Sequence, residues 1–219
     1  MNRELRFAQH NLTEYVIRRF WKALTLTFPS MCVNDGISID YREHYLTANK
    51  MEHIVQKLTQ CKSSHVACPF FQFDYDPSNS TPHHVTAVTL TKTDKYNVLS
   101  FFDPKGKGSC RKKEEYALMK ILVEKITEKT GIPTKLYIYN GKNLQQDDNI
   151  GLCQLYSLFY LYEFVNEVSA MSPKSIHTIV DPNRMVNHIA QKRGSFNDKT
   201  LFAFWNAFFR IALNLSSKR

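Results

Sequence analysis

Hydrophobic and polar residues alternate in the middle of the chain, which is the pattern of paired β-strands. The segment 84–90 alternates, is rich in β-branched residues and begins with a histidine, and a second apolar run follows at 98–102. That run stops at Asp103, because the next residue is Pro104 and proline cannot continue a central ladder. The pattern predicts an antiparallel hairpin with His84 at its first end and Asp103 at its last.

The rest of the chain divides into helical and strand-like segments. Apolar residues recur every three or four positions where a helix is predicted and at every second position where a strand is predicted. Helices are predicted over 3–24, 49–60 and 113–130, from 153 along one apolar face, from about 173 and from about 197, and strands over 66–75 and 135–139. This order predicts an α+β fold with a central, mostly antiparallel sheet flanked by helices.

A cysteine stands where the most apolar of these helices begins. A thiol at a helix N-terminus lies beside unpaired backbone N–H groups and the positive end of the helix dipole, and both favour the thiolate of Cys153. Gln146, seven residues upstream, can bring an amide donor back over the sulfur, as acyl transfer requires. A cysteine in this position is more often a small apolar residue, so a catalytic role also needs a base.

The predicted hairpin supplies that base. Its two ends are adjacent in an antiparallel pair, so Asp103 can fix the tautomer of His84 while the other ring nitrogen faces the thiol. The simpler alternatives are a surface histidine and an ordinary turn over 103–106, and each alone is the commoner outcome. The ordered set of His, Asp, Gln and a Cys that begins a helix favours nucleophilic catalysis over coincidence.

These residues resemble the adenovirus-type (adenain-like) cysteine proteases and the related ubiquitin-like-specific, or SUMO-deconjugating, proteases. Both share the chain order His, Asp or Glu, Gln, Cys, with the Gln six or seven residues before the Cys. The matching pieces here are 84–88, 101–104, Gln146 and Cys153, with gaps of 19 residues from His to Asp and 50 from Asp to Cys. The resemblance is best over 83–165. Two positions depart from it, since Val85 replaces the usual Trp and Gln154 the usual Gly.

The resemblance implies a papain-like, adenain-like core and a cysteine endopeptidase. Cys153 would be the nucleophile, His84 the base and then the acid, and Asp103 the residue that orients His84. Gln146 and the Cys153 backbone N–H would hold the oxyanion. The implied substrates are precursor proteins, above all viral ones, cut next to small residues such as glycine. No cofactor is expected for the chemistry, although DNA or a peptide is implied as an activator.

Three other functions remain open at this point. The same residue order would serve a protease that removes ubiquitin or a ubiquitin-like modifier, including one of a bacterial effector kind. It would also serve an acetyltransferase, since effector acetyltransferases use a similar His, acid and Cys order. The non-enzymatic alternative is a basic nucleic-acid-binding protein in which the four residues coincide by chance.

The net charge adds a candidate nucleic-acid interface. Lys and Arg exceed Asp and Glu by nine. Five cations follow the second hairpin strand within nine residues: Lys105, Lys107, Arg111, Lys112 and Lys113. Such a run is usually a solvated surface, but it also suits a polyanion. The resemblance to proteases assisted by DNA favours non-specific DNA binding there.

Cysteine usage bears on compartment and metal. The five cysteines are Cys32, Cys61, Cys68, Cys110 and Cys153, an odd number at irregular spacing. They predict unpaired thiols in a reducing, intracellular compartment, and the resemblance adds a virion or the nucleus or cytoplasm of a host cell. Cys61, His65 and Cys68, with His83 or His84 nearby, lack a second short-spaced ligand pair, so we expect no metal.

Length and composition favour one domain. The 219 residues are 43% hydrophobic, which suffices for a single substantial core. We predict one cysteine protease domain over 1–219, with an N-terminal helical part (1–62), a catalytic core (63–168) and C-terminal helices (169–219). No apolar run reaches membrane-spanning length. Charged residues stand where a signal peptide needs an apolar core, so export by that route is not expected.

Overall fold

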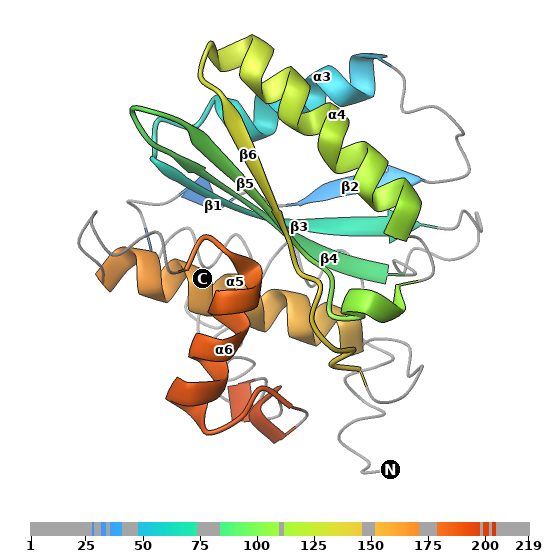
Figure 1. Cartoon of the computed structure of the whole chain (residues 1–219), viewed down its shortest axis with the longest axis vertical. Coiled ribbons are helices and arrows are strands. Elements are labelled where there is room, and N and C mark those ends of the chain that lie inside the picture. Colours follow the sequence, from blue (N-terminus) through green and yellow to red (C-terminus); the bar gives the residue numbers. More distant parts are fainter. Residues whose placement is uncertain are drawn as a thin grey trace, which may run out of the picture.

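A six-stranded sheet separates two layers of helices in the computed structural model of the chain (Figure 1). The structure describes residues 28, 32–33, 36–40, 48–73, 84–109, 112–145, 152–170, 179–197, 199–201 and 203–204. The strands are β1 (Cys32–Val33), β2 (Ile37–Asp40), β3 (His65–Phe73), β4 (His84–Lys92), β5 (Asn97–Phe102) and β6 (Thr134–Ile138). The helices are α3 (Ala48–Thr59), the short 3-10 helix η1 (Gly106–Gly108), α4 (Lys112–Thr130), α5 (Leu152–Ala170) and α6 (Pro182–Arg193).

The predicted hairpin forms the centre of the sheet, whose order is β1-β3-β4-β5-β6 with β2 also paired to β3. β3 and β5 both run antiparallel to β4, as expected. The outer pairings are parallel, so the α+β class is confirmed but the sheet is mixed rather than mostly antiparallel. The reason at the β6 edge is the connection through α4, because a helical crossover returns the chain in the same direction.

The first 62 residues contribute strands as well as a helix. We expected a helical N-terminal part, yet β1 and β2 both pair with β3. β1 pairs with Val66 and Ala67, and β2 pairs from Phe70 onward, so Pro69 falls between the two partners. A proline has no N–H for the ladder, and its position coincides with the break between β1 and β2. The predicted helix over 3–24 lies outside the described residues.

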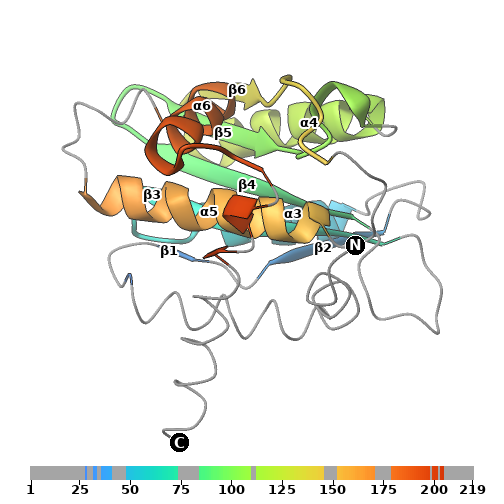
Figure 2. The same ribbon diagram turned by 90° about the horizontal axis from the view of Figure 1, so that it is seen from below.

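Helices lie against both faces of the sheet (Figure 2), and each face supports a separate apolar core. Alternate residues of β3 divide between them: Val66 and Phe70 face α3 and α4, and Ala67 and Phe71 face α5. α5 was expected to have one apolar face, but it is buried on nearly all sides. Its far side packs under the C-terminal segment, where the Phe159 ring lies 4.6 Å from the Phe204 ring between centroids.

The remaining helices agree with the sequence in part. α3, α4 and α5 begin within a residue of the predicted positions. α6 begins at Pro182, where the Asp181 side chain accepts a hydrogen bond from the Asn183 N–H at 2.9 Å. The predicted start near 173 lies outside the described residues, whereas 199–201 are helical, close to the predicted last helix. Among the described helices, none is long and apolar enough to cross a membrane.

The expectation of unpaired thiols was wrong for two cysteines. Cys32 and Cys61 form a disulfide, with their Cα atoms 6.0 Å apart. The cause is the parallel pairing of β1 with the start of β3, which brings the residues before β3 beside Cys32. Cys68 and Cys153 are buried outside this disulfide, and Cys110 is not described.

Candidate active site

The strand register brings the predicted imidazole and carboxylate together. Phe102 pairs with Ala87, so Asp103 lies just past the end of β5 beside the first residues of β4. The Nε2 atom of His84 lies 2.9 Å from Oδ1 of Asp103, and both side chains are buried. The same Oδ1 accepts a hydrogen bond from the Lys105 backbone N–H at 2.9 Å, which fixes the carboxylate from the turn.

The candidate nucleophile reaches this pair from the other face of the sheet. Cys153 is the second residue of α5 and is 4% exposed. Its thiol interacts with the His84 side chain and with the Val85 backbone N–H. One turn later, the Ser157 hydroxyl donates to the Val85 carbonyl at 2.8 Å and holds α5 against β4. Since Nε2 of His84 is bonded to Asp103, Nδ1 is the ring nitrogen left for the thiol.

The electrostatics of the three groups favour an ion pair. Burial disfavours a charged His84, but the Cys153 thiolate and Asp103 outweigh it and raise the pKa of His84 to about 10. Burial likewise opposes the thiolate, yet the charge and hydrogen bond of His84 bring the pKa of Cys153 below its usual value. The pKa of Asp103 is also lowered, because its contacts with His84 outweigh its burial. Both shifts favour a thiolate beside an imidazolium over the neutral pair.

The loop that leads to α5 is tied to the turn after Asp103. The Leu144 backbone N–H donates to the Pro104 carbonyl at 2.9 Å. Gly106 has a φ of 52°, and a Cβ there would lie 2.5 Å from the Gly141 carbonyl oxygen. The close approach requires glycine at position 106. Together with the Leu144 hydrogen bond, it holds residues 141–144 against the turn that follows Asp103.

The predicted oxyanion donor Gln146 lies outside the described residues. Its neighbour Gln145 is described: its side chain is buried, and its backbone N–H donates to the Asn143 side chain at 3.0 Å. The Oε1 atom of Gln145 has no hydrogen-bond partner among the described residues. The choice between the two glutamines stays a prediction.

Sequence reasoning missed a second buried carboxyl group in the site. Glu115, in the first turn of α4, is 3% exposed and accepts hydrogen bonds from the Gln72 amide at 2.9 Å and the Ser109 hydroxyl at 3.3 Å. Burial, and then the charge of Asp103, raise the pKa of Glu115 to about 7. An acidic residue in a first helical turn is usually a solvated partner of the helix dipole, so no local pattern indicates that Glu115 is buried.

Two sets of residues contain side chains of the kinds that bind metals. In the set suggested by the sequence, Cys61 belongs to the disulfide and His65 contacts Thr91 at 3.3 Å. The side-chain ligand atoms of His84, Asp103 and Glu115 lie within 4.8 Å of one another. Nε2 of His84 is already bonded to Asp103, and the carboxyl of Glu115 accepts from two donors. We therefore interpret these side chains as hydrogen-bonding groups and not as metal ligands.

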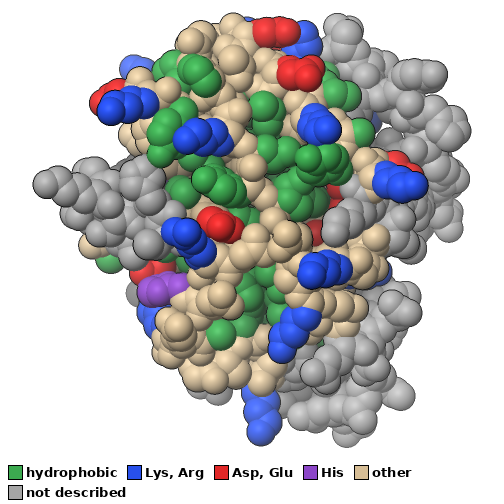
Figure 3. Space-filling view, viewed as in Figure 1, with side chains coloured by type: hydrophobic (Ala, Val, Ile, Leu, Met, Phe, Trp, Pro, Cys, Tyr) green, Lys and Arg blue, Asp and Glu red, His purple; other side chains and the backbone are tan. Residues whose placement is uncertain are grey.

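The basic run surrounds the turn after Asp103, as its position in the sequence requires. Lys107, in η1, and Lys113, at the start of α4, are exposed, and Lys105 is half-buried. Arg111 and the side chain of Lys112 lie outside the described residues. On the face seen in Figure 3, Lys and Arg side chains are spread among other residues rather than gathered into one stripe. DNA binding by this run stays a prediction.

Comparisons with known proteins find similar folds only among solved structures. No protein-family model and no curated protein sequence matches. The ASFV pS273R protease is 14% identical with a TM-score of 0.49, and the match covers 80% of this chain and 64% of that one. ChlaDub1 from Chlamydia trachomatis is 8% identical with a TM-score of 0.49, and the match covers 85% of this chain and 91% of that one.

A third similar structure is the Chlamydia trachomatis effector protein Cdu1, solved bound to ubiquitin. It is 8% identical with a TM-score of 0.45, and the match covers 81% of this chain and 91% of that one. A protease and a protein solved bound to ubiquitin are thus among the structures that the chain resembles. The chain spans slightly less than two thirds of the ASFV protease. At these identities the likeness concerns the fold at most, so the chemistry has to be inferred from the side chains.

Proposed function

We propose that the chain is a cysteine endopeptidase that cleaves precursor proteins next to small residues such as glycine, as a viral maturation protease does. The observation that carries this proposal is the contact of Cys153, at the N-terminus of α5, with a His84 ring whose Nε2 is held by Asp103. Such an arrangement stores a reactive thiolate beside a proton donor, which is what acyl transfer to sulfur needs.

Acylation follows from the proton positions. The Cys153 thiolate attacks the scissile carbonyl carbon, a C–S bond forms, and the carbonyl oxygen becomes an oxyanion held by the Cys153 backbone N–H and Gln146. As the C–N bond breaks, Nδ1 of His84 gives its proton to the leaving amine. The products of this half-reaction are a thioester on Cys153, a free amine and a neutral His84. Asp103 keeps the Nε2 proton in place throughout, so Nδ1 remains the exchanging atom.

Deacylation reverses these proton movements. Neutral His84 takes a proton from water at Nδ1, and the resulting hydroxide attacks the thioester carbon. Collapse of the second tetrahedral intermediate breaks the C–S bond and releases the carboxylic acid. The thiolate and the imidazolium are then restored, which is the state that the low pKa of Cys153 and the high pKa of His84 favour.

The preference for small residues has physical support beside the resemblance. Only 4% of Cys153 and 8% of His84 is exposed, so a peptide must bring its backbone close to a buried sulfur. A glycine next to the scissile bond has no side chain to hinder this approach, whereas a branched side chain would hinder it. A flexible Gly-Gly terminus of a ubiquitin-like modifier meets the same requirement, which makes deconjugation the competing function.

Intact-mass measurements with three reagents test the proposal. An electrophilic peptide ending in Gly-Gly should add one equivalent to the chain, and the adduct should be absent in Cys153→Ala. Faster labelling by a full-length ubiquitin-like electrophilic probe would favour a deconjugating protease, and an acetyl group taken from acetyl-coenzyme A would favour acetyl transfer. Absence of every adduct in a folded sample would contradict all three enzymatic functions.

The basic run gives a separate prediction about DNA. If its cations contact phosphates, the logarithm of the affinity for duplex DNA should fall with log salt at a slope of about −3 to −5, at about 0.9 per contact. Lys107→Ala, Arg111→Ala and Lys112→Ala together should flatten that slope by about two units or more, with little sequence preference in either protein. Fluorescence anisotropy at several salt concentrations measures both.

The matched control for this variant removes three exposed lysines elsewhere, at Lys62, Lys95 and Lys120. It lowers the net charge equally, so it separates a local contact from a general charge effect. Basal peptide hydrolysis should survive in both variants, because none of the six residues belongs to the proposed reactive set. Equal slopes for the two variants would mean that the run is only a solvated surface.

A further inference from the structure

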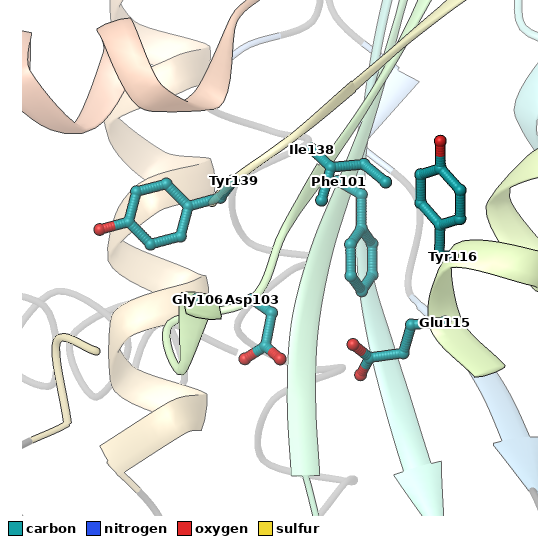
Figure 4. Close-up of a pocket in the computed structure, with 7 residues that line it drawn as sticks. All are labelled: Phe101, Asp103, Gly106, Glu115, Tyr116, Ile138 and Tyr139. Carbon is teal, nitrogen blue, oxygen red and sulfur yellow. The ribbon is translucent and has the colours of Figure 1, made fainter. Parts of the chain in front are cut away.

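Two carboxyl groups face each other beneath the proposed catalytic histidine. Figure 4 shows the side chains of Asp103 and Glu115 turned toward one another at a small pocket between β5 and α4. Each residue is 3% exposed, and each offers an oxygen within 4.8 Å of the other and of His84. Carboxylates buried at such a separation repel each other strongly, so one of them is expected to keep its proton.

The strand register explains why the group gathers at this point. Gln72 is paired with His84, and both lie on the face of the sheet that also carries Phe70 and Val88. Asp103 lies two residues beyond Phe101 on that same face, which α4 covers. Period-two alternation therefore directs all three polar side chains toward the first turn of α4, where Glu115 meets them.

The hydrogen bonds of the cluster leave one acceptor unused. Oδ1 of Asp103 accepts from His84 and from the Lys105 N–H, whereas Oδ2 is buried without a hydrogen-bond partner among the described residues. The Gln72 amide occupies Oε1 of Glu115 at 2.9 Å, and the Ser109 hydroxyl, which also interacts with Asp103, donates to Oε2 at 3.3 Å. A buried carboxylate oxygen without a donor is costly, and a proton on Glu115 would supply the missing donor.

We propose that Glu115 is a positioning residue: its protonated carboxyl group donates to Oδ2 of Asp103 and so fixes the carboxylate that orients His84. This inference deepens the proposed function and rests on it. Glu115 touches neither the nucleophile nor the substrate, and it acts only through Asp103. The Gln72 amide in turn orients Glu115, because its N–H donor holds Oε1. The proton then lies on Oε2, which also accepts from the Ser109 hydroxyl at 3.3 Å.

The titration of Glu115 agrees with this role. Burial and the Asp103 charge raise its pKa to about 7, against the opposing effects of the Gln72 amide, the His84 charge and the Ser109 hydroxyl. The Cys153 thiolate faces this cluster through His84, whose pKa it raises by its charge and hydrogen bond. Below about pH 7 the donor is in place. Above that pH Glu115 loses its proton, which places a second negative charge opposite Asp103. This charge raises the pKa of His84, so His84 becomes a weaker acid toward the leaving amine.

NMR of the His84 ring tests the coupling without any need for turnover. In the intact chain, the ring signals should shift with a midpoint near pH 7 as Glu115 ionises. Glu115→Gln should abolish that step, because the amide has nearly the same shape and does not titrate. Glu114→Gln, an exposed neighbour in the same helical turn, should leave it unchanged. A step that persists in Glu115→Gln would overturn the proposal.

Kinetics then separate positioning from simple packing. With a cleavable peptide, Glu115→Ala should lower kcat on the order of tenfold with little change in KM, since it removes a hydrogen bond to a charged group. Glu115→Gln should recover most of that loss, to within about threefold of wild type, and should lack the decline in kcat above about pH 7. Equal losses in both variants with unchanged pH profiles would overturn the role. If the NMR step behaves as expected but no peptide is cleaved, the proton-sharing pair stands and the peptidase proposal falls.

Discussion

Cys153→Ala is expected to abolish peptide cleavage, with a fall in kcat of roughly 10⁴-fold or more, because no other group at the site can form the thioester. The fold should survive. Alanine favours a helix, and the loss of one sulfur from the second residue of α5 leaves only a small space. Hydrolysis assays and thermal unfolding of the purified variant measure the two effects separately.

The same residue should also be the most reactive cysteine at low pH. Its lowered pKa predicts alkylation by iodoacetamide at about pH 6, well under the usual thiol pKa near 8.5. Cys32 and Cys61 should not react until they are reduced, because they form a disulfide. Cys68 should react slowly, because it is a fully buried thiol in the core under α3 and α4. Equal labelling of Cys68 and Cys153, read by peptide mapping, would contradict the assignment of the nucleophile.

Local periodicity was enough to predict the elements that carry the triad. The period-two pattern of β4 and β5, ended by Pro104, fixed which ends of the hairpin meet, and the contact of His84 with Asp103 follows from it. The apolar helix after residue 152 likewise appears in the sequence as a continuous pattern. Such signals depend on neighbours along the chain, and tertiary packing reinforces them instead of opposing them.

Long-range pairings decided what the sequence could not predict. Glu115 and Gln72 are 43 residues apart, and each alone resembles an ordinary polar surface position. Only the covering of β3 by α4 buries them together. The disulfide between Cys32 and Cys61 depends in the same way on the parallel pairing of β1, a strand of two residues with too short a pattern to detect.

The geometry also explains why the two departures from the protease motif are tolerable. Val85, in place of the usual Trp, is buried in the core, and its backbone contacts both Cys153 and Ser157, so its part in the site does not depend on an aromatic ring. Gln154, in place of the usual Gly, is buried within α5, where the backbone is helical and needs no special freedom. Both replacements therefore leave the three reactive groups in contact.

Gln146→Ala is expected to lower kcat by about a hundredfold or more, the usual cost of losing one oxyanion donor. The reason is spacing: Gln146 stands seven residues before the nucleophile, as in the proteases that the chain resembles, and Gln145 stands eight. Gln145→Ala is the matched control and should stay closer to wild type in kcat, with any loss appearing as lower thermal stability because its side chain is buried. Single-turnover kinetics with a labelled peptide, on samples shown to be folded, measure acylation directly. A hundredfold loss in Gln145→Ala with near-normal acylation in Gln146→Ala would place the donor one residue earlier, and the loop would then enter α5 in a different register from the one predicted.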